Sequence, residues 1–172
     1  HFLYSMAPAA QYTVAAVGIL TALFAASIGI AQNDIKKILA YSTISQLGYM
    51  FLGVGTGAYA AGIFHVVTHA FFKACLFLCA GSIIHALGGV QDIRQMGGLF
   101  RRMPVTSWTL IAATAAICGF PPFSGFFSKD EILLHAFVTW GIAGKALWTA
   151  GVLGACLTSF YMARLMFLAL AG

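Results

Sequence analysis

Residues 65–73, HVVTHAFFK, place two histidines and a lysine at intervals of four residues inside a long apolar segment. In an α-helix this spacing puts His65, His69 and Lys73 in one row along one side. With a rise of about 1.5 Å per residue, neighbours in the row are about 6 Å apart along the axis, a gap that one or two waters could bridge. Ionisable side chains inside an apolar helix are costly, so the row indicates a function.

The composition indicates that most of the chain is embedded in lipid. Of its 172 residues, 61% are hydrophobic and 8% are charged, and the mean hydropathy is +0.93. Soluble domains are about 45–50% apolar and about 25% charged, so a soluble fold of this length could not bury so much apolar surface. The net charge of +5 implies no nucleic acid partner, because excess Lys and Arg is typical of cytoplasmic loops in membrane proteins.

The apolar segments predict an all-α integral membrane protein, with about five transmembrane helices forming a single unit over residues 1–172. The expected spans are 9–31, 38–55, 60–86, 105–143 and 146–170. The fourth is too long for one crossing and too short for two with a loop. It contains Pro121-Pro122, and prolines lack the N–H that continues a helix, so we expect this helix to be broken there. Because the chain starts at His1 and ends in an apolar run, we expect it to be part of a longer protein.

Lys73 is the strongest candidate for chemistry in the row. It lies near the middle of its span, where an ammonium is costly and where neither interface is within easy reach, so it is suited to load and unload a proton. His65 and His69 suit a proton relay, because imidazole titrates near physiological pH; the alternative is that they are core residues bonded to backbone carbonyls. A metal site is not expected, since the Glu of HExxH and a third ligand are missing.

The run 128–131, Ser-Lys-Asp-Glu, follows the break and is the second unusual feature. A break frees backbone groups, which is tolerated only against protein or in a water-filled cavity. We therefore expect Lys129, with Asp130 beside it, to face a hydrated pocket. The alternative is an interfacial loop between two re-entrant hairpins.

Other polar side chains have structural interpretations. Those of segment 38–55 are predicted to form interhelical hydrogen bonds, with a water-lined path as the alternative. Arg164 is expected to extend toward the membrane interface. The four cysteines lie in apolar runs without a metal-ligand grouping, and we expect them to be small packing residues.

Four motifs carry a resemblance to a known family. They are 34–49 (DIKKILAYSTISQLGY), 64–73 (FHVVTHAFFK), 91–98 (QDIRQMGG) and 120–132 (FPPFSGFFSKDEI). Over essentially the whole chain, they resemble the antiporter-like subunits of respiratory complex I, the proton-pumping NADH:quinone oxidoreductase, and in particular its L type (mitochondrial chain 5). The alternative is the large subunit of Mrp-type multisubunit sodium/proton antiporters, which shares the row 65–73; the motif 91–98 and the run 128–131 favour complex I. A purely structural membrane anchor is a third interpretation.

The resemblance implies a role for each candidate residue. The family's subunits contain two inverted five-helix units, each with a broken helix, and this chain resembles the second unit. Lys73 would be the central proton-carrying group, and His65 and His69 would line the connecting water path. Lys129, with Asp130 beside it, would belong to the half-channel toward the outer face. A lysine at position 129 resembles the L type, because the M type carries a glutamate there.

The resemblance also implies partners and location. The sequence has no GxGxxG motif and no cysteine cluster, so we expect no redox centre or other cofactor on this chain. FMN, iron–sulfur clusters and quinone would lie in partner subunits, and an M-type subunit would be the neighbour. The unit would move protons through internal water across a bilayer, most simply the bacterial cytoplasmic (inner) membrane. Without the first unit and the lateral helix of the family, the chain alone should not pump.

The basic loop residues predict the orientation in the membrane. One side carries Lys36, Lys37, Arg94, Arg101 and Arg102, and the other carries only Lys145. The first side should be cytoplasmic, because positive loops stay inside. In a full-length, cysteine-depleted protein, Gln95→Cys should resist a membrane-impermeant maleimide added outside sealed cells and should react in inverted vesicles. Ready labelling from outside would overturn the assignment.

Overall fold

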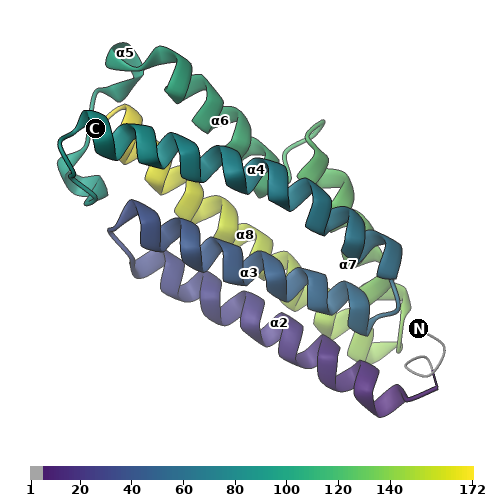
Figure 1. Ribbon diagram of the computed structural model, residues 1–172. Coiled ribbons are helices and arrows are strands. Elements are labelled where there is room, and N and C mark those ends of the chain that lie inside the picture. Colours follow the sequence, from purple (N-terminus) through teal and green to yellow (C-terminus); the bar gives the residue numbers. More distant parts are fainter. Residues whose placement is uncertain (1–5) are drawn as a thin grey trace.

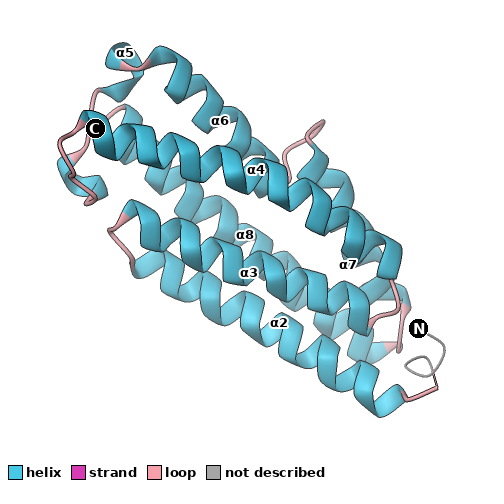
Figure 2. Ribbon diagram, viewed as in Figure 1, coloured by secondary structure: helices cyan, strands magenta, loops and turns pink. Residues whose placement is uncertain are grey.

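A computed structural model describes residues 6–172, and in this part of the chain the regular structure is entirely helical (Figures 1 and 2). The elements are α2 (Pro8–Ala31), α3 (Ile35–Gly55), α4 (Tyr59–Ala86), η1 (Ile93–Gln95), α5 (Leu99–Arg102), α6 (Pro104–Cys118), α7 (Ser124–Val138) and α8 (Ile142–Leu170). The long helices run side by side, and α2 begins at the end of the bundle opposite to where α8 ends (Figure 1). The predicted all-α architecture is confirmed.

The predicted helix break is confirmed between α6 and α7, and it contains Pro121-Pro122. Gly119 ends α6 in the left-handed region at φ +80°, a conformation that glycine adopts without strain. Each half has 15 residues, or about 22 Å of helix, whereas the hydrocarbon is about 30 Å thick. The two halves therefore make one crossing together. Their connecting loop lies away from both ends of the bundle (Figure 2).

The other crossings are continuous helices. The helices α2, α4 and α8 are each long and apolar enough to cross a membrane. The helix α3 has 21 residues and packs along α2. It is more polar than the other crossing helices, and several of its polar side chains are buried in the protein interior. The helix α8 begins at Ile142, a turn earlier than its sequence pattern predicts.

The helices α2 and α3 pack with almost no space between their backbones. A Cβ atom added to Gly48 would lie 2.5 Å from the carbonyl oxygen of Gly18 and 2.6 Å from the nitrogen of Ala22. A Cβ on Gly55 would lie 2.5 Å from the nitrogen of Ala15. Lipid supplies no hydrophobic drive for helix association, so such close contacts between small residues hold membrane helices together.

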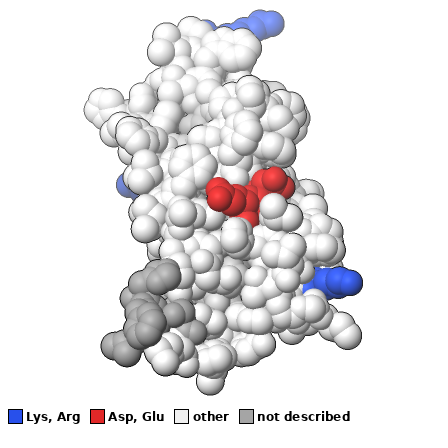
Figure 3. Space-filling view, turned by 90° about the vertical axis from the view of Figure 1, so that its right-hand side faces the viewer, with Lys and Arg blue, Asp and Glu red and all other residues white. Residues whose placement is uncertain are grey.

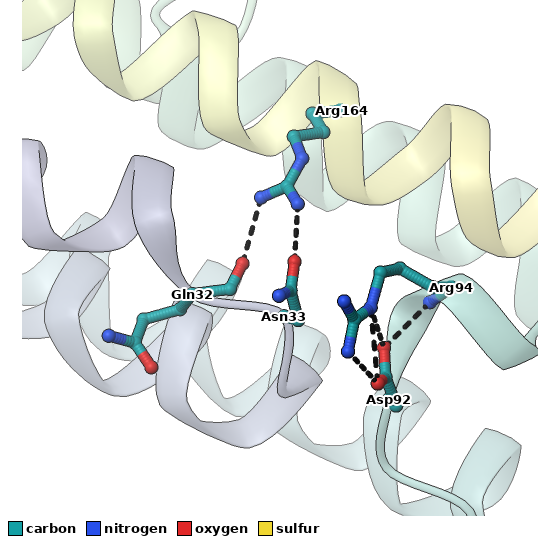
Figure 4. A network of polar contacts seen from close by, with 5 residues as sticks. All are labelled: Gln32, Asn33, Asp92, Arg94 and Arg164. Atoms are coloured by element: carbon teal, nitrogen blue, oxygen red, sulfur yellow. Dashed lines mark hydrogen bonds and ion pairs between the residues drawn. The ribbon is translucent and has the colours of Figure 1, made fainter.

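A cluster of polar contacts at one end ties three segments together (Figure 4). The guanidinium of Arg164 on α8 donates to the carbonyls of Ile30 and Gln32, each at 2.8 Å, and to Asn33 Oδ1 at 2.5 Å. The last carbonyls of a helix lack helical partners, so Arg164 caps α2. Arg164 was expected to extend toward the membrane interface; its half-buried side chain reaches the end of the bundle and makes three hydrogen bonds there.

The same end joins two loops that are distant in sequence. Ile35 N–H donates to Gln91 O at 3.0 Å, and Ile93 N–H donates to Asn33 O at 2.8 Å. The bridge brings Asp34, which caps α3, beside Asp92, which caps η1. Hydrogen bonds from the Arg94 side chain and backbone lower the pKa of Asp92 to about 2. The basic loops that the sequence assigns to one side thus share one end of the bundle.

The packing of α2 on α3 generates a stability prediction. Gly48→Ala in the full-length protein should destabilise it by about 1–3 kcal/mol, because the added methyl meets backbone atoms that cannot move aside. The matched control is Gly81→Ala on α4, where an added Cβ has nothing within 4 Å and should be neutral or slightly stabilising. Thermal unfolding in detergent measures both. Equal melting temperatures for the two variants would contradict the packing argument.

Candidate functional site

The row of residues predicted on α4 faces the interior of the bundle. His65, His69 and Lys73 are all buried, whereas Phe71 and Leu78 on the same helix are about three-quarters exposed, at 76% and 75%. The rings of His65 and His69 have centroids 6.2 Å apart. This separation is too long for a direct hydrogen bond between the two rings.

Lys73 is buried among neutral acceptors. Its ammonium donates to the carbonyl of Leu39 at 2.9 Å and to Ser42 Oγ at 2.8 Å, both on α3, and only 5% of the side chain is exposed. Within residues 6–172 the sole ion pair is Arg94–Asp92 at the end of the bundle, so no carboxylate of this part of the chain pairs with Lys73. The ammonium is therefore held by two neutral oxygen acceptors, and it lies 5.9 Å from the centre of the Phe77 ring.

His65 connects α4 with the two neighbouring helices. Its Nδ1 lies 2.8 Å from Ser128 Oγ on α7, and its Nε2 lies 3.2 Å from Gln46 Oε1 on α3. Thr68 Oγ1 lies 3.5 Å from the same Ser128 hydroxyl. The structure therefore brings the row on α4 together with the residue that precedes Lys129.

Lys129 occupies the place that the helix break creates. In a continuous helix, the carbonyl of Ile117 would accept from the N–H of residue 121, but that residue is a proline and has none. The ammonium of Lys129 donates to this carbonyl instead, and it lies 5.5 Å from the centre of the Tyr49 ring. The cation also suits the negative end of the α6 dipole. Like Lys73, it is buried, with 4% exposure.

Asp130 and Lys129 point in different directions. Asp130 and Glu131 are exposed, and no ion pair joins Asp130 to Lys129 among the described residues. Figure 3 shows acidic side chains together in the middle of an otherwise largely uncharged face. Both Lys129 and Asp130 nevertheless line a pocket of about 140 Å³ beside the break, together with Cys118, Gly119, Phe126, Leu133 and Ala155. The pocket lets the buried ammonium and the outer carboxylate face one space.

The prediction that polar side chains of segment 38–55 form interhelical hydrogen bonds is confirmed, although the sequence did not indicate their partners. Ser42, Gln46 and Tyr49 contact Lys73, His65 and Lys129 in turn. Their spacing of four and three residues marks one helix face, and that pattern was the available signal. Tyr49 also fixes α3 to α8, because its hydroxyl donates to Gly151 O at 2.5 Å.

The fold and this site define a polytopic helical membrane protein that has a broken helix and two buried lysines. A family model described as NADH:quinone oxidoreductase/Mrp antiporter, transmembrane, matches residues 1–158, and the chain belongs to this family.

Relatives of both kinds named in that description are similar to the chain. It is 52% identical to NAD(P)H-quinone oxidoreductase chain 5 of Synechocystis, over 96% of the chain and 25% of the relative. It is 52% identical to NADH-quinone oxidoreductase subunit L of Mycobacterium tuberculosis, over 99% of the chain and 27% of the relative. The solved Mrp complex from Dietzia sp. DQ12-45-1b contains a chain that is 34% identical, with a TM-score of 0.85, over 92% of this chain and 18% of that one. The chain thus spans about a quarter of the length of the curated relatives.

Proposed function

We propose that this chain is the second antiporter-like unit of an L-type subunit of respiratory NADH:quinone oxidoreductase, and that it moves protons through a buried lysine–histidine relay. The observation that carries the proposal is the pair of buried lysines, Lys73 and Lys129, neither of which has a carboxylate partner within residues 6–172. The names of the relatives at 52% identity, subunit L and chain 5, support the same function.

Lys73 is the proposed proton carrier at the centre of the unit. A lysine paired with a carboxylate would keep its proton, because losing it would strand a buried negative charge. The carbonyl of Leu39 and the hydroxyl of Ser42 are neutral, and the hydroxyl can turn to donate to the amine that remains after the proton leaves. Both protonation states of Lys73 therefore keep a hydrogen-bond partner.

The histidines are the proposed link between Lys73 and Lys129. Internal water would bridge His65 and His69, whose rings are 6.2 Å apart. The Ser128 hydroxyl contacts His65 at 2.8 Å and precedes Lys129 on α7. Lys129 and Asp130 would continue the path into the pocket beside the break and toward the outer face.

The remaining parts of the proposal concern the assembly. The driving chemistry would lie in partner subunits that carry FMN, iron–sulfur clusters and quinone, and an M-type membrane subunit would be the neighbour. The bacterial cytoplasmic membrane is the proposed location, since Synechocystis and Mycobacterium tuberculosis, the sources of the relatives named above, are bacteria.

The large subunit of an Mrp-type sodium/proton antiporter is the second candidate function. It is favoured by the similarity to the Dietzia Mrp complex, at a TM-score of 0.85. The lower identity to that chain, 34% against 52% for the quinone oxidoreductase relatives, makes it the second choice. Copurification of the full-length protein with flavin and iron–sulfur subunits would separate the two.

Lys73→Met in the full-length subunit, within its native assembly, tests the relay. Proton pumping in reconstituted vesicles should fall at least tenfold, because a thioether cannot gain or lose a proton. Lys73→Arg should fail as well, since a guanidinium keeps its proton. Native gels should show normal assembly, because removing an unpaired buried cation leaves no opposite charge behind.

The matched control is Lys145→Met, which removes an exposed lysine from the first turn of α8 and should leave pumping unchanged. If Lys73→Met pumps at the wild-type rate with normal coupling, the row on α4 is structural and the proposed function fails.

A further inference from the structure

Gln46 has a buried side-chain amide that is only half satisfied. Both Gln46 and His65 are fully buried, at 0% exposure. The amide oxygen lies 3.2 Å from His65 Nε2, whereas the amide nitrogen has no hydrogen-bond partner among residues 6–172. Buried amides normally satisfy both groups. The exception lies against a histidine of the candidate relay, which points to a role beyond packing.

The contacts of His65 fix the position of its proton. A neutral imidazole has one nitrogen that donates and one that accepts. The oxygen of Gln46 can only accept, so His65 Nε2 carries the hydrogen in this arrangement. The lone pair of Nδ1 then accepts from the Ser128 hydroxyl at 2.8 Å. Ser128 can do either, because its oxygen also lies 3.4 Å from the carbonyl of Gly125, to which it can donate instead.

We propose that Gln46 is a positioning residue for His65: it holds the proton of the neutral ring on Nε2 and keeps Nδ1 open toward Ser128, so that protons enter His65 from the α7 side. This inference rests on the proposed function above. A proton arriving at Nδ1 gives an imidazolium whose two N–H groups donate to Gln46 Oε1 and Ser128 Oγ. Its loss from Nδ1 restores the starting tautomer.

The unpartnered amide nitrogen gives the ring a second way to discharge. If the imidazolium instead releases its other proton, from Nε2, to the internal water proposed between His65 and His69, the bare nitrogen needs a donor. Rotation of the amide by half a turn brings Gln46 Nε2 to that place, and no other hydrogen bond opposes the rotation within residues 6–172. His65 Nδ1–H then donates to Ser128, which donates to Gly125. One amide thus fits both neutral forms of the ring and the cation between them.

Few other groups influence His65. The titratable side chains that act on it electrostatically are Lys129 of α7 and His69 of α4. The helix α3 brings Gln46, which does not titrate, and Tyr49 three residues further along the same face, and the only titratable side chain on α6 is that of Cys118. A charge placed at position 46 is therefore the most direct way to change the proton affinity of His65.

The test measures proton pumping against pH for Gln46→Glu and Gln46→Met in the full-length subunit within its native assembly. A carboxylate beside Nε2–H favours the imidazolium. The pH at which pumping declines on the alkaline side of the profile (the alkaline limb) should therefore rise by about one unit for Gln46→Glu, a tenfold change in the proton affinity of His65. Gln46→Met removes the acceptor, so its alkaline limb should move down. Gln46→Leu should move it the same way.

The control is Ser45→Ala, the neighbouring buried position on α3, whose hydroxyl donates to Ala22 O at 3.0 Å on the side away from His65. Its pH profile should match the wild type. The position of the limb does not depend on how much complex assembles, so reduced yield does not obscure the result. If the alkaline limb of the pH profile is unshifted in all three Gln46 variants, or moves in the same direction in all three, Gln46 is a packing residue. Such a result for the Gln46 variants, found together with a Lys73→Met variant that does not pump, would overturn the inference about Gln46 and leave the proposed function standing.

Discussion

Hydrocarbon offers no hydrogen bonds, so every backbone group inside the bundle must find a partner in the protein. The proline pair breaks this rule, because neither proline has an N–H, and Pro121 leaves Ile117 O without its helical donor. Lys129 meets the need of that carbonyl with its ammonium. The same contact gives the buried ammonium of Lys129 an acceptor inside the protein. The break and the buried cation therefore stabilise one another, and the pocket beside them follows from the gap in the helix.

The polar face of α3 depends on the contact between α2 and α3 behind it. The helix that presents Ser42, Gln46 and Tyr49 to the interior also buries apolar side chains, but in lipid the burial of apolar surface does not drive helices together. Close approach at Gly18 and Gly48 supplies van der Waals contact instead. Small residues at the contact between α2 and α3 thus help to position the polar side chains on the opposite face of α3.

Much of the fold could be predicted from the sequence, because hydropathy sets the crossings and a proline pair ends a helix whatever surrounds it. Side-chain partners between helices could not. The spacing of residues on α3 indicates a face, but which of them meets His65 depends on the rotation of two helices about their axes. Asp130 is instructive: adjacent residues differ by about 100° around a helix, so neighbours in sequence came to lie inside and outside. Arg164 binds carbonyls on α2, more than 130 positions away, and no local pattern reports that.

Charge is used in two ways along this chain. At the end of the bundle, Arg94 and Asp92 form a close pair at 2.6 Å in a water-exposed loop, where both charges are permanent and serve to shape η1. In the interior, Lys73 and Lys129 contact only carbonyls, a hydroxyl and aromatic rings. A carboxylate beside either lysine would lower the cost of burying the ammonium and would hinder release of its proton, since a buried pair resists losing one of its charges. Neutral acceptors hold the cation less firmly, and a group held in that way can exchange its proton with water or with a neighbouring imidazole. The acidic residues of the described chain lie at the bundle end or on its surface, so none of them forms an ion pair with either buried lysine.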